Sequence, residues 1–175
     1  MLFVTARCHV EVQSWIKTHP MPDCSKGEKP KLGYVKLNGT MILNVPSCTP
    51  KTANTDKDRG THIQLIDPFA CTKTDNRHFD TYASAQEAEQ LRDYLEQLAD
   101  FSVIVGSMAD EASHELPSAH NALLKVGVDL TDIKWKGSFA FVTQKSTNKT
   151  VLNKAVNAAV SRKSPAHVNA IITGM

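Results

Sequence analysis

The sequence has 175 residues, which suits one domain, spanning residues 1–175, that buries roughly two thirds of its unfolded surface. Its 20 lysine and arginine residues against 18 aspartate and glutamate residues give a net charge of +2, and this near balance argues against nucleic acid as a partner. No apolar run approaches the roughly 18–20 residues that cross a bilayer, so membrane insertion is not expected. Met1–Ala6 is too short for a signal peptide.

Four cysteines, Cys8, Cys24, Cys48 and Cys71, lie in the first half and lack the close spacing of zinc or thioredoxin-like sites. Three pairings are open to them. Cys24 and Cys48 flank an expected hairpin whose ends must approach, which favours Cys24–Cys48 and, by elimination, Cys8–Cys71. The alternative is four reduced cysteines in a cytosolic protein.

Two glycosylation sequons, at Asn38 and Asn148, favour a secreted or extracellular protein. Disulfides point to the same compartment. The short N-terminus conflicts with this interpretation unless the chain is a mature or recombinant form.

The N-terminal half predicts strands. His9–Ile16 alternates between apolar and polar positions, and Trp15 then faces away from the apolar side. Two antiparallel hairpins are expected next, the first about the turn Asn38-Gly39. Their strands are Gly33–Leu37 with Thr40–Val45, and Thr61–Asp67 with Asn76–Thr81.

In the second half, helices alternate with strands. Ser84-Ala85-Gln86-Glu87 is a capping box that predicts a helix, whose buried face is formed by alanine and leucine residues at helical spacing. That face consists of Ala88, Leu91, Leu95 and Leu98. The later elements are a strand over Ser102–Ser107, a helix over Pro117–Val126, a strand over Ser138–Thr143, an amphipathic helix over Val151–Ser161 and a strand over His167–Thr173. The order of elements predicts an α/β layered domain.

Asp110–Leu116 is a candidate binding corner. It follows an apolar strand and precedes a helix, and residues just past a buried strand are rigidly supported yet face solvent. A second loop carries Trp135 and Lys136 before another apolar strand. Carboxylates, amines and an aromatic ring suit a sugar. The alternative is structural: Asp110 or Ser113 caps the following helix, and Trp135 is an ordinary packed aromatic residue.

Catalysis and metal binding are not expected. Asp110 and Glu111 are adjacent and point apart, whereas glycosidase carboxylates flank one bond at roughly 5–9.5 Å. His114 and His120 are six residues apart and do not share a helix face. No nucleophile elbow, cysteine-protease signature or glycine-rich phosphate loop is present, so neither an enzyme nor a cofactor is predicted.

Four segments, taken in order and with their spacing, resemble the interleukin-like EMT inducer / pancreatic-derived factor domain. The segments are Arg59–Asp67, His78–Tyr82, Val103–Ser107 with Asp110-Glu111, and Ser138–Val142. The resemblance covers about residues 59–145. It implies an α+β fold of two facing, mainly antiparallel β-sheets with flanking helices. Residues 8–48 would add a strand and hairpin, and residues 146–175 a helix-strand extension.

Members of that family include secreted cytokine-like proteins, a segment of cell-surface hyaluronidase-type proteins, and the lectin-like stem of the O-mannose N-acetylglucosaminyltransferase. The resemblance implies that acidic sugar-binding positions fall on Asp110 and Glu111, and the tryptophan and basic positions on Trp135 and Lys136. Ser113 and His114 complete the predicted carbohydrate site. The family pattern Trp-Arg-Asp becomes Trp135-Lys136-Gly137 here. The planar guanidinium donor is thus replaced by the point charge of a lysine, so the pattern does not specify which sugar binds.

The sequence therefore predicts a lectin without catalytic activity whose partners are glycans or glycoproteins. Its ligand would be a terminal β-linked sugar such as N-acetylglucosamine or a galactoside. A lectin that bridges cells needs two sites, so a homo-oligomer is expected, with Trp15 or the C-terminal segment as dimer contact. The alternative is a secreted cytokine-like protein that binds a protein receptor. A detached stem-like module is less favoured because the chain has its own start.

Overall fold

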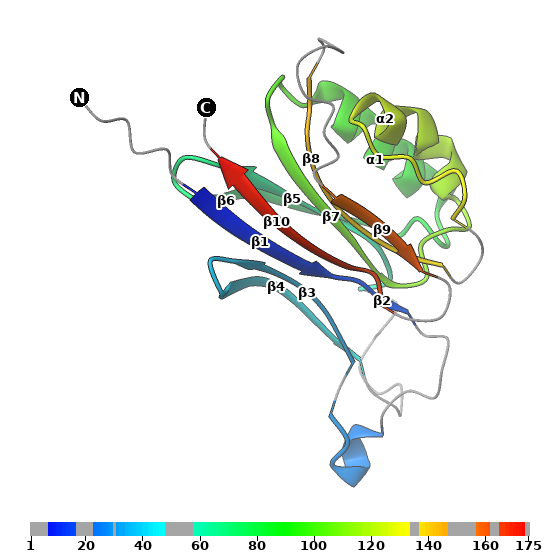
Figure 1. The fold of residues 1–175 in the computed structure, drawn as a ribbon. Helices are drawn as coiled ribbons and strands as arrows, with labels where there is room; N and C mark the ends of the chain where they lie inside the picture. The colour runs from blue at the N-terminus through cyan, green and yellow to red at the C-terminus, as the bar shows by residue number, and fades with distance from the viewer. Residues whose placement is uncertain are drawn as a thin grey trace.

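A computed structural model describes residues 7–16, 23–29, 31–47, 58–133, 137–146, 157–161 and 165–173. Two β-sheets face one another, and two helices cover the outer side of one of them (Figure 1). This arrangement confirms the predicted fold class. Within the described residues, no helix is both long and apolar enough to cross a membrane.

The small sheet has four antiparallel strands in the order β10-β1-β3-β4. The large sheet has the order β6-β5-β7-β8-β9, and the short strand β2 adds to β7 in parallel. The small-sheet strands are β10 (His167–Thr173), β1 (Arg7–Gln13), β3 (Lys31–Leu37) and β4 (Thr40–Ser47). The large-sheet strands are β6 (Thr72–Phe79), β5 (Gly60–Asp67), β7 (Val103–Asp110), β8 (Ser138–Gln144), β9 (Asn157–Ser161) and β2 (Trp15–Ile16).

The helices lie on the face of the large sheet that points away from the small sheet (Figure 1). They are α1 (Ala85–Gln97) and α2 (His120–Lys125), the latter preceded by a 3-10 turn at Leu116–Ala119; another 3-10 turn spans Cys24–Lys26. Strand β7 has all eight residues buried because it is covered on both faces, as its apolar sequence predicts. The predicted strand at Ser102–Ser107 thus extends to Asp110.

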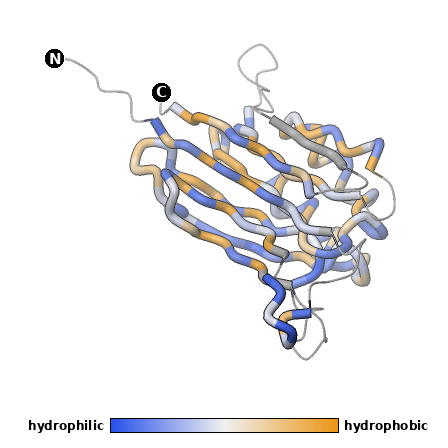
Figure 2. The backbone as a smooth tube through the Cα atoms, turned by 60° about the horizontal axis from the view of Figure 1, so that its bottom comes forward, coloured by the Kyte–Doolittle hydropathy of each residue, from blue (hydrophilic) through white to orange (hydrophobic). Residues whose placement is uncertain are grey.

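Two hydrophobic cores follow from these layers. One lies between the sheets, where buried residues of β1 alternate with more exposed ones. The hydropathy of successive residues alternates along the strands in the same way (Figure 2). Its central members include Val10, Val12, Val35, Val105 and Val142. The other lies between the large sheet and the helices and includes Ile63, Leu91, Leu95, Ile104, Leu123 and Phe139.

The disulfide Cys8–Cys71 is present and links β1 of the small sheet to the β5–β6 turn of the large sheet, as predicted. Cys24 is also disulfide-bonded, but its predicted partner Cys48 lies outside the described residues. The first hairpin turns at Asn38-Gly39, both with positive φ, as its sequence predicts. Asn148, the second sequon, lies outside the described residues.

The prediction that Trp15 faces away from the core is wrong. Ser14 interrupts the strand and is held by hydrogen bonds from its backbone amide to the Ala166 carbonyl, 2.9 Å, and from the Met108 amide to its hydroxyl, 3.1 Å. The alternation of side chains therefore restarts after Ser14. Trp15 is 2% exposed and packs with Val45 and Ala109, so it offers no dimer contact.

The predicted helix over Val151–Ser161 is wrong for its described part. Residues Asn157–Ser161 form β9, which pairs antiparallel with β8, whereas residues 151–156 lie outside the described residues. Pairing with the neighbouring strand supplies backbone hydrogen bonds that local helix propensity cannot anticipate. The terminal strand His167–Thr173 is confirmed with its predicted bounds.

Candidate binding site

Three chain segments meet where β7 ends. Gly60, the first residue of β5, pairs with Ala109 of β7, and Thr61 pairs with Phe79, the last residue of β6. The loops that precede β5 and follow β6 and β7 therefore converge at one end of the large sheet. We name the residues gathered there the β7 corner. They are Arg59, Gly60, Asp80, Thr81, Tyr82 and the loop Asp110–Glu115.

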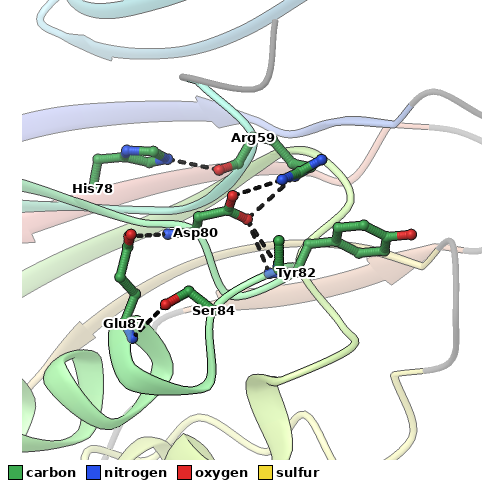
Figure 3. Close-up of polar contacts among 7 residues, drawn as sticks. Arg59, His78, Asp80, Tyr82, Ser84 and Glu87 are labelled. Atoms are coloured by element: carbon green, nitrogen blue, oxygen red, sulfur yellow. Dashed lines mark hydrogen bonds and ion pairs between the residues drawn. The ribbon is translucent and has the colours of Figure 1, made fainter.

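An ion pair between Arg59 and Asp80 fixes the base of the corner (Figure 3). Arg59 donates from Nη2 to Asp80 Oδ2 at 2.7 Å and from Nε to Oδ1 at 3.2 Å, a two-pronged contact. Both side chains are 17% exposed. Burial alone would raise the pKa of Asp80, but the hydrogen bonds and charge of Arg59, with help from nearby backbone amides, lower it below its usual value.

The Asp80 carboxylate also shapes the turn that carries Tyr82. Its Oδ1 accepts hydrogen bonds from the backbone amides of Tyr82, 3.3 Å, and Ala83, 3.1 Å. The Asp80 amide in turn donates to Glu87 Oε2 at 2.6 Å, which ties the turn to the first turn of α1 (Figure 3). The position of Tyr82 is thus set by both β6 and α1.

Tyr82 presents a partly exposed aromatic ring next to the side chains of Arg59 and His114. The Arg59 guanidinium carbon lies 4.7 Å from the centre of the ring, within cation–π range. The His114 ring lies 5.8 Å away, tilted by 54°. The side chain of His114 is 65% exposed, and its Nδ1 lies 3.0 Å from Glu115 Oε1. The Glu115 amide donates to the Thr81 carbonyl at 2.8 Å, which holds the His114 loop against the Tyr82 turn.

The acidic residues of the corner are largely buried. Asp110 is 9% exposed and has a φ of +59°, and Glu111 is 7% exposed. Glu111 Oε1 accepts three hydrogen bonds within its own loop, from the amides of Ala112 and Ser113 and from the Ser113 hydroxyl, at 2.6–3.0 Å. The hydrogen bonds of Glu111 and Ser113 therefore stabilise the conformation of the loop. The residue at the capping position of the following 3-10 turn is Glu115, not Asp110 or Ser113, and the Glu115 side chain forms no capping hydrogen bond.

The structure brings together four of the predicted site residues: Asp110, Glu111, Ser113 and His114. Trp135 and Lys136 lie outside the described residues. Sequence reasoning gave no role to Tyr82, although it follows a strand end and precedes a helix, as Asp110 does. Reading every strand-to-helix turn in that way would have singled it out.

A pair of stacked histidines supports the corner from the side of the small sheet. The rings of His62 and His78, from paired positions on β5 and β6, lie 4.5 Å apart. Each Nε2 donates to a backbone carbonyl, His62 to Asp58 at 2.8 Å and His78 to Arg59 at 2.7 Å. The two rings therefore fix the backbone from which Arg59 reaches Asp80. Sequence reasoning missed this pair because the histidines are 16 positions apart.

The described part of the chain contains no group of three histidine, cysteine, aspartate or glutamate side chains that could hold a metal ion. The groups that converge on the corner are a ring, a guanidinium and an imidazole. Such groups can bind a polar ligand by stacking and hydrogen bonding.

The sequence profile described as "Interleukin-like EMT inducer" matches residues 59–147, which contain the whole β7 corner. The chain belongs to the interleukin-like EMT inducer family. It is also similar to the human "Cell migration-inducing and hyaluronan-binding protein", with 36% identity over 70 residues. That match covers 39% of this chain and 5% of the relative. Family membership thus agrees with the resemblance carried by the sequence motifs.

Proposed function

We propose that this family member is a carbohydrate-binding protein without catalytic activity, and that the β7 corner binds a terminal β-linked sugar such as N-acetylglucosamine or a galactoside. The observation that carries the proposal is the Tyr82 ring, fixed beside the exposed His114 on hydrogen-bonded turns. A fixed ring can cover the apolar face of a sugar at little entropic cost.

Polar groups around the ring suit sugar hydroxyls, which both donate and accept hydrogen bonds. His114 supplies an exposed imidazole, and Asp110 lies four positions earlier in the chain, at the end of β7. Glu111 and Ser113 set the shape of the loop. Trp135 and Lys136 are proposed as further contacts from the second loop.

One comparison supports a role without catalysis, and the other supports a saccharide ligand. The interleukin-like EMT inducer family is not a known catalytic family, which agrees with a binding role. The name of the human relative includes the binding of hyaluronan, a polysaccharide. We extend a saccharide ligand to this chain as a proposal, because the match covers a small part of that relative.

We also propose a secreted or extracellular location. The Cys8–Cys71 disulfide supports it, since disulfides persist in oxidising compartments. A homo-oligomer would add avidity if the protein bridges glycans on two cells. With Trp15 buried, the C-terminal segment is the remaining proposed contact.

A glycan array tests the proposal, using the wild-type chain and the variants Tyr82→Ala and His114→Ala. The wild type should bind β-linked glycans, and free sugar should compete. Both variants should lose roughly tenfold or more in affinity, about 1.4 kcal/mol, with an unchanged circular dichroism spectrum. Phe69→Ala is the matched control, because Phe69 is an exposed aromatic residue in the turn at the other end of β5. An array without binding to the folded wild type would refute the proposal.

A cytokine-like role is the second candidate, favoured by two exposed aromatic residues away from the β7 corner. Phe69 and Phe101 are 61% and 59% exposed, and both lie at the end of the large sheet opposite the β7 corner, where β5 ends and β7 begins. Exposed aromatic side chains are typical of protein interfaces. An empty array together with receptor binding that Phe69→Ala weakens would favour this role.

A further inference from the structure

A groove runs between α1 and the edge strand β6. It has a volume of about 350 Å³ and is lined by Arg77, Phe79, Gln90, Asp93, Tyr94 and Gln97. We propose that this groove is a second binding site, which takes one neutral pyranose unit of a saccharide. Its residues lie outside the β7 corner, so the proposal does not depend on the function proposed for that corner.

The groove has an aromatic floor that is held in place. The Tyr94 ring lies 5.9 Å from the ring of Phe79, which is 6% exposed. The Tyr94 hydroxyl donates to Asp75 Oδ2 at 3.0 Å, and the Arg77 guanidinium carbon lies 5.7 Å from the ring centre. Burial first, and then the hydrogen bond to Asp75, raise the pKa of Tyr94 to about 12, so the hydroxyl stays a neutral donor.

Hydrogen bonds at two points hold α1 along β6. Near the start of the helix, Glu87 Oε2 accepts from the Asp80 amide at 2.6 Å. Two turns further on, Tyr94 is bound to Asp75. Arg77 and Phe79 lie between these points on the strand, so the walls of the groove are fixed before a ligand arrives. Such preorganisation lowers the entropic cost of binding.

Side chains at the rim of the groove have donor and acceptor groups that can form further hydrogen bonds. Arg77 is 57% exposed and uses Nε for Asp75 at 3.3 Å; its other N–H groups bond to no residue in the described ranges. Gln90 and Gln97 are exposed, seven positions apart and hence on one helix face. Neither amide side chain is hydrogen-bonded to another described residue. Asp93, 52% exposed, adds acceptor oxygens.

The balance of charge favours a neutral ligand. Arg77 pairs with Asp75, and Arg92 pairs with Asp93, so each cation at the groove is matched by a carboxylate. The groove therefore lacks the net charge that attracts an ion. Sugar hydroxyls match a rim of amides, guanidinium and carboxylate, and the apolar face of a pyranose matches the ring of Tyr94. The volume is at the lower end of small-ligand sites, which span about 300–1,000 Å³.

An amide-resolved NMR titration of the full chain with the methyl β-glycosides of glucose, galactose and N-acetylglucosamine tests the proposal. At least one sugar should shift the backbone amides of Arg77, Gln90, Tyr94 and Gln97 in a saturable way. Arg77→Gln should weaken this binding about tenfold, or ~1.4 kcal/mol. Lys73→Gln is the matched control, because it removes one exposed cation from the same strand outside the groove and should leave the affinity unchanged.

The double variant Gln90→Ala/Gln97→Ala provides a second test that keeps the helix, since alanine is favourable at exposed helical positions. It should weaken binding as Arg77→Gln does. The corner variant Tyr82→Ala should leave the shifts in the groove unchanged. Absence of saturable shifts with all three sugars would overturn the proposal, as would equal affinities of Arg77→Gln and Lys73→Gln. Loss of the groove shifts in Tyr82→Ala would also overturn it, because binding would then belong to the corner.

Discussion

Gly60 shows how one residue allows the β7 corner to form. Its φ is +117°, and a Cβ there would overlap the carbonyl oxygen of Phe79. This close approach of β5 to the end of β6 places Arg59 next to Asp80. A left-handed backbone and the absence of space both require glycine at this position.

We expect Gly60→Ala to lower the free energy of unfolding by about 2–3 kcal/mol, since it adds backbone strain and a steric clash. Gly39→Ala is the matched control: its φ is +81° but no atom lies within 4 Å of the added Cβ. It should cost about 1 kcal/mol from strain alone. Urea denaturation measures the free energy of unfolding of both variants. Equal losses in the two variants would show that the approach to Phe79 is unimportant.

His62 makes stability depend on pH at the residue scale. Burial, opposed by the Asp58 carbonyl and assisted by the nearby His78, lowers the pKa of His62 from 6.5 to about 4. As pH falls from about 6.5 to 4, His62 binds a proton in the unfolded chain but not in the folded chain. Stability is therefore full above that window and falls within it, by about 3 kcal/mol in total.

The test compares unfolding free energies at pH 7 and pH 4.5 in urea. The wild type should lose more stability between these values than His62→Gln, which cannot titrate. His9→Gln, at an exposed position of β1, should behave as the wild type does. The lowered pKa of Asp80 affects stability mainly below its usual value of 3.8, outside this comparison. The same pH dependence in all three proteins would contradict the assignment.

At the scale of elements, α1 shows which parts of a local motif can be predicted. The Ser84 hydroxyl accepts from the Glu87 amide at 3.1 Å, as the capping box predicts. In a capping box the glutamate carboxylate also accepts from the serine amide. Here the Glu87 carboxylate binds the Asp80 amide instead, and the Ser84 amide donates to the Asp80 carbonyl at 3.1 Å. The end of β6 supplies this competing partner, which local sequence does not reveal.

The C-terminal end of α1 is held by Lys145, which lies just beyond β8. Its Nζ donates to the carbonyls of Leu95, Glu96 and Leu98 at 3.1, 2.8 and 2.6 Å. A cation at this end also interacts favourably with the helix dipole. Lys145→Met should therefore lower the free energy of unfolding by about 1–2 kcal/mol.

Lys125→Met is its control, since the ion pair of Lys125 with Glu96 is largely exposed. It should change the free energy of unfolding by less than about 0.5 kcal/mol. Thermal and urea denaturation of both variants measure these two changes in the free energy of unfolding. If Lys125→Met costs as much as Lys145→Met, the carbonyl contacts contribute no special stability.

For the whole molecule, the Cys8–Cys71 disulfide joins the two sheets across a sequence separation of 63 residues. A crosslink of that length restricts the unfolded chain and should contribute about 4 kcal/mol. The double variant Cys8→Ala/Cys71→Ala should unfold at a correspondingly lower urea concentration. An unchanged midpoint would mean that sheet packing alone determines stability.

Sequence patterns could predict the layers because periodicity reports which face is buried. They placed β10 correctly and located most other strands. They misplaced Trp15 because Ser14 separates β1 from β2, and they assigned Asn157–Ser161 to a helix. The acidic half of the β7 corner followed from its position after β7. Tyr82 and the stacked histidines depend on register between strands, which a single sequence does not specify.

The most direct test of the central claim is a crystal structure of the protein with the best β-linked glycan from the array. The account predicts a terminal sugar in van der Waals contact with the Tyr82 ring and hydrogen-bonded to His114 or Asp110. A sugar bound only at other surfaces, with the β7 corner unoccupied, would contradict it.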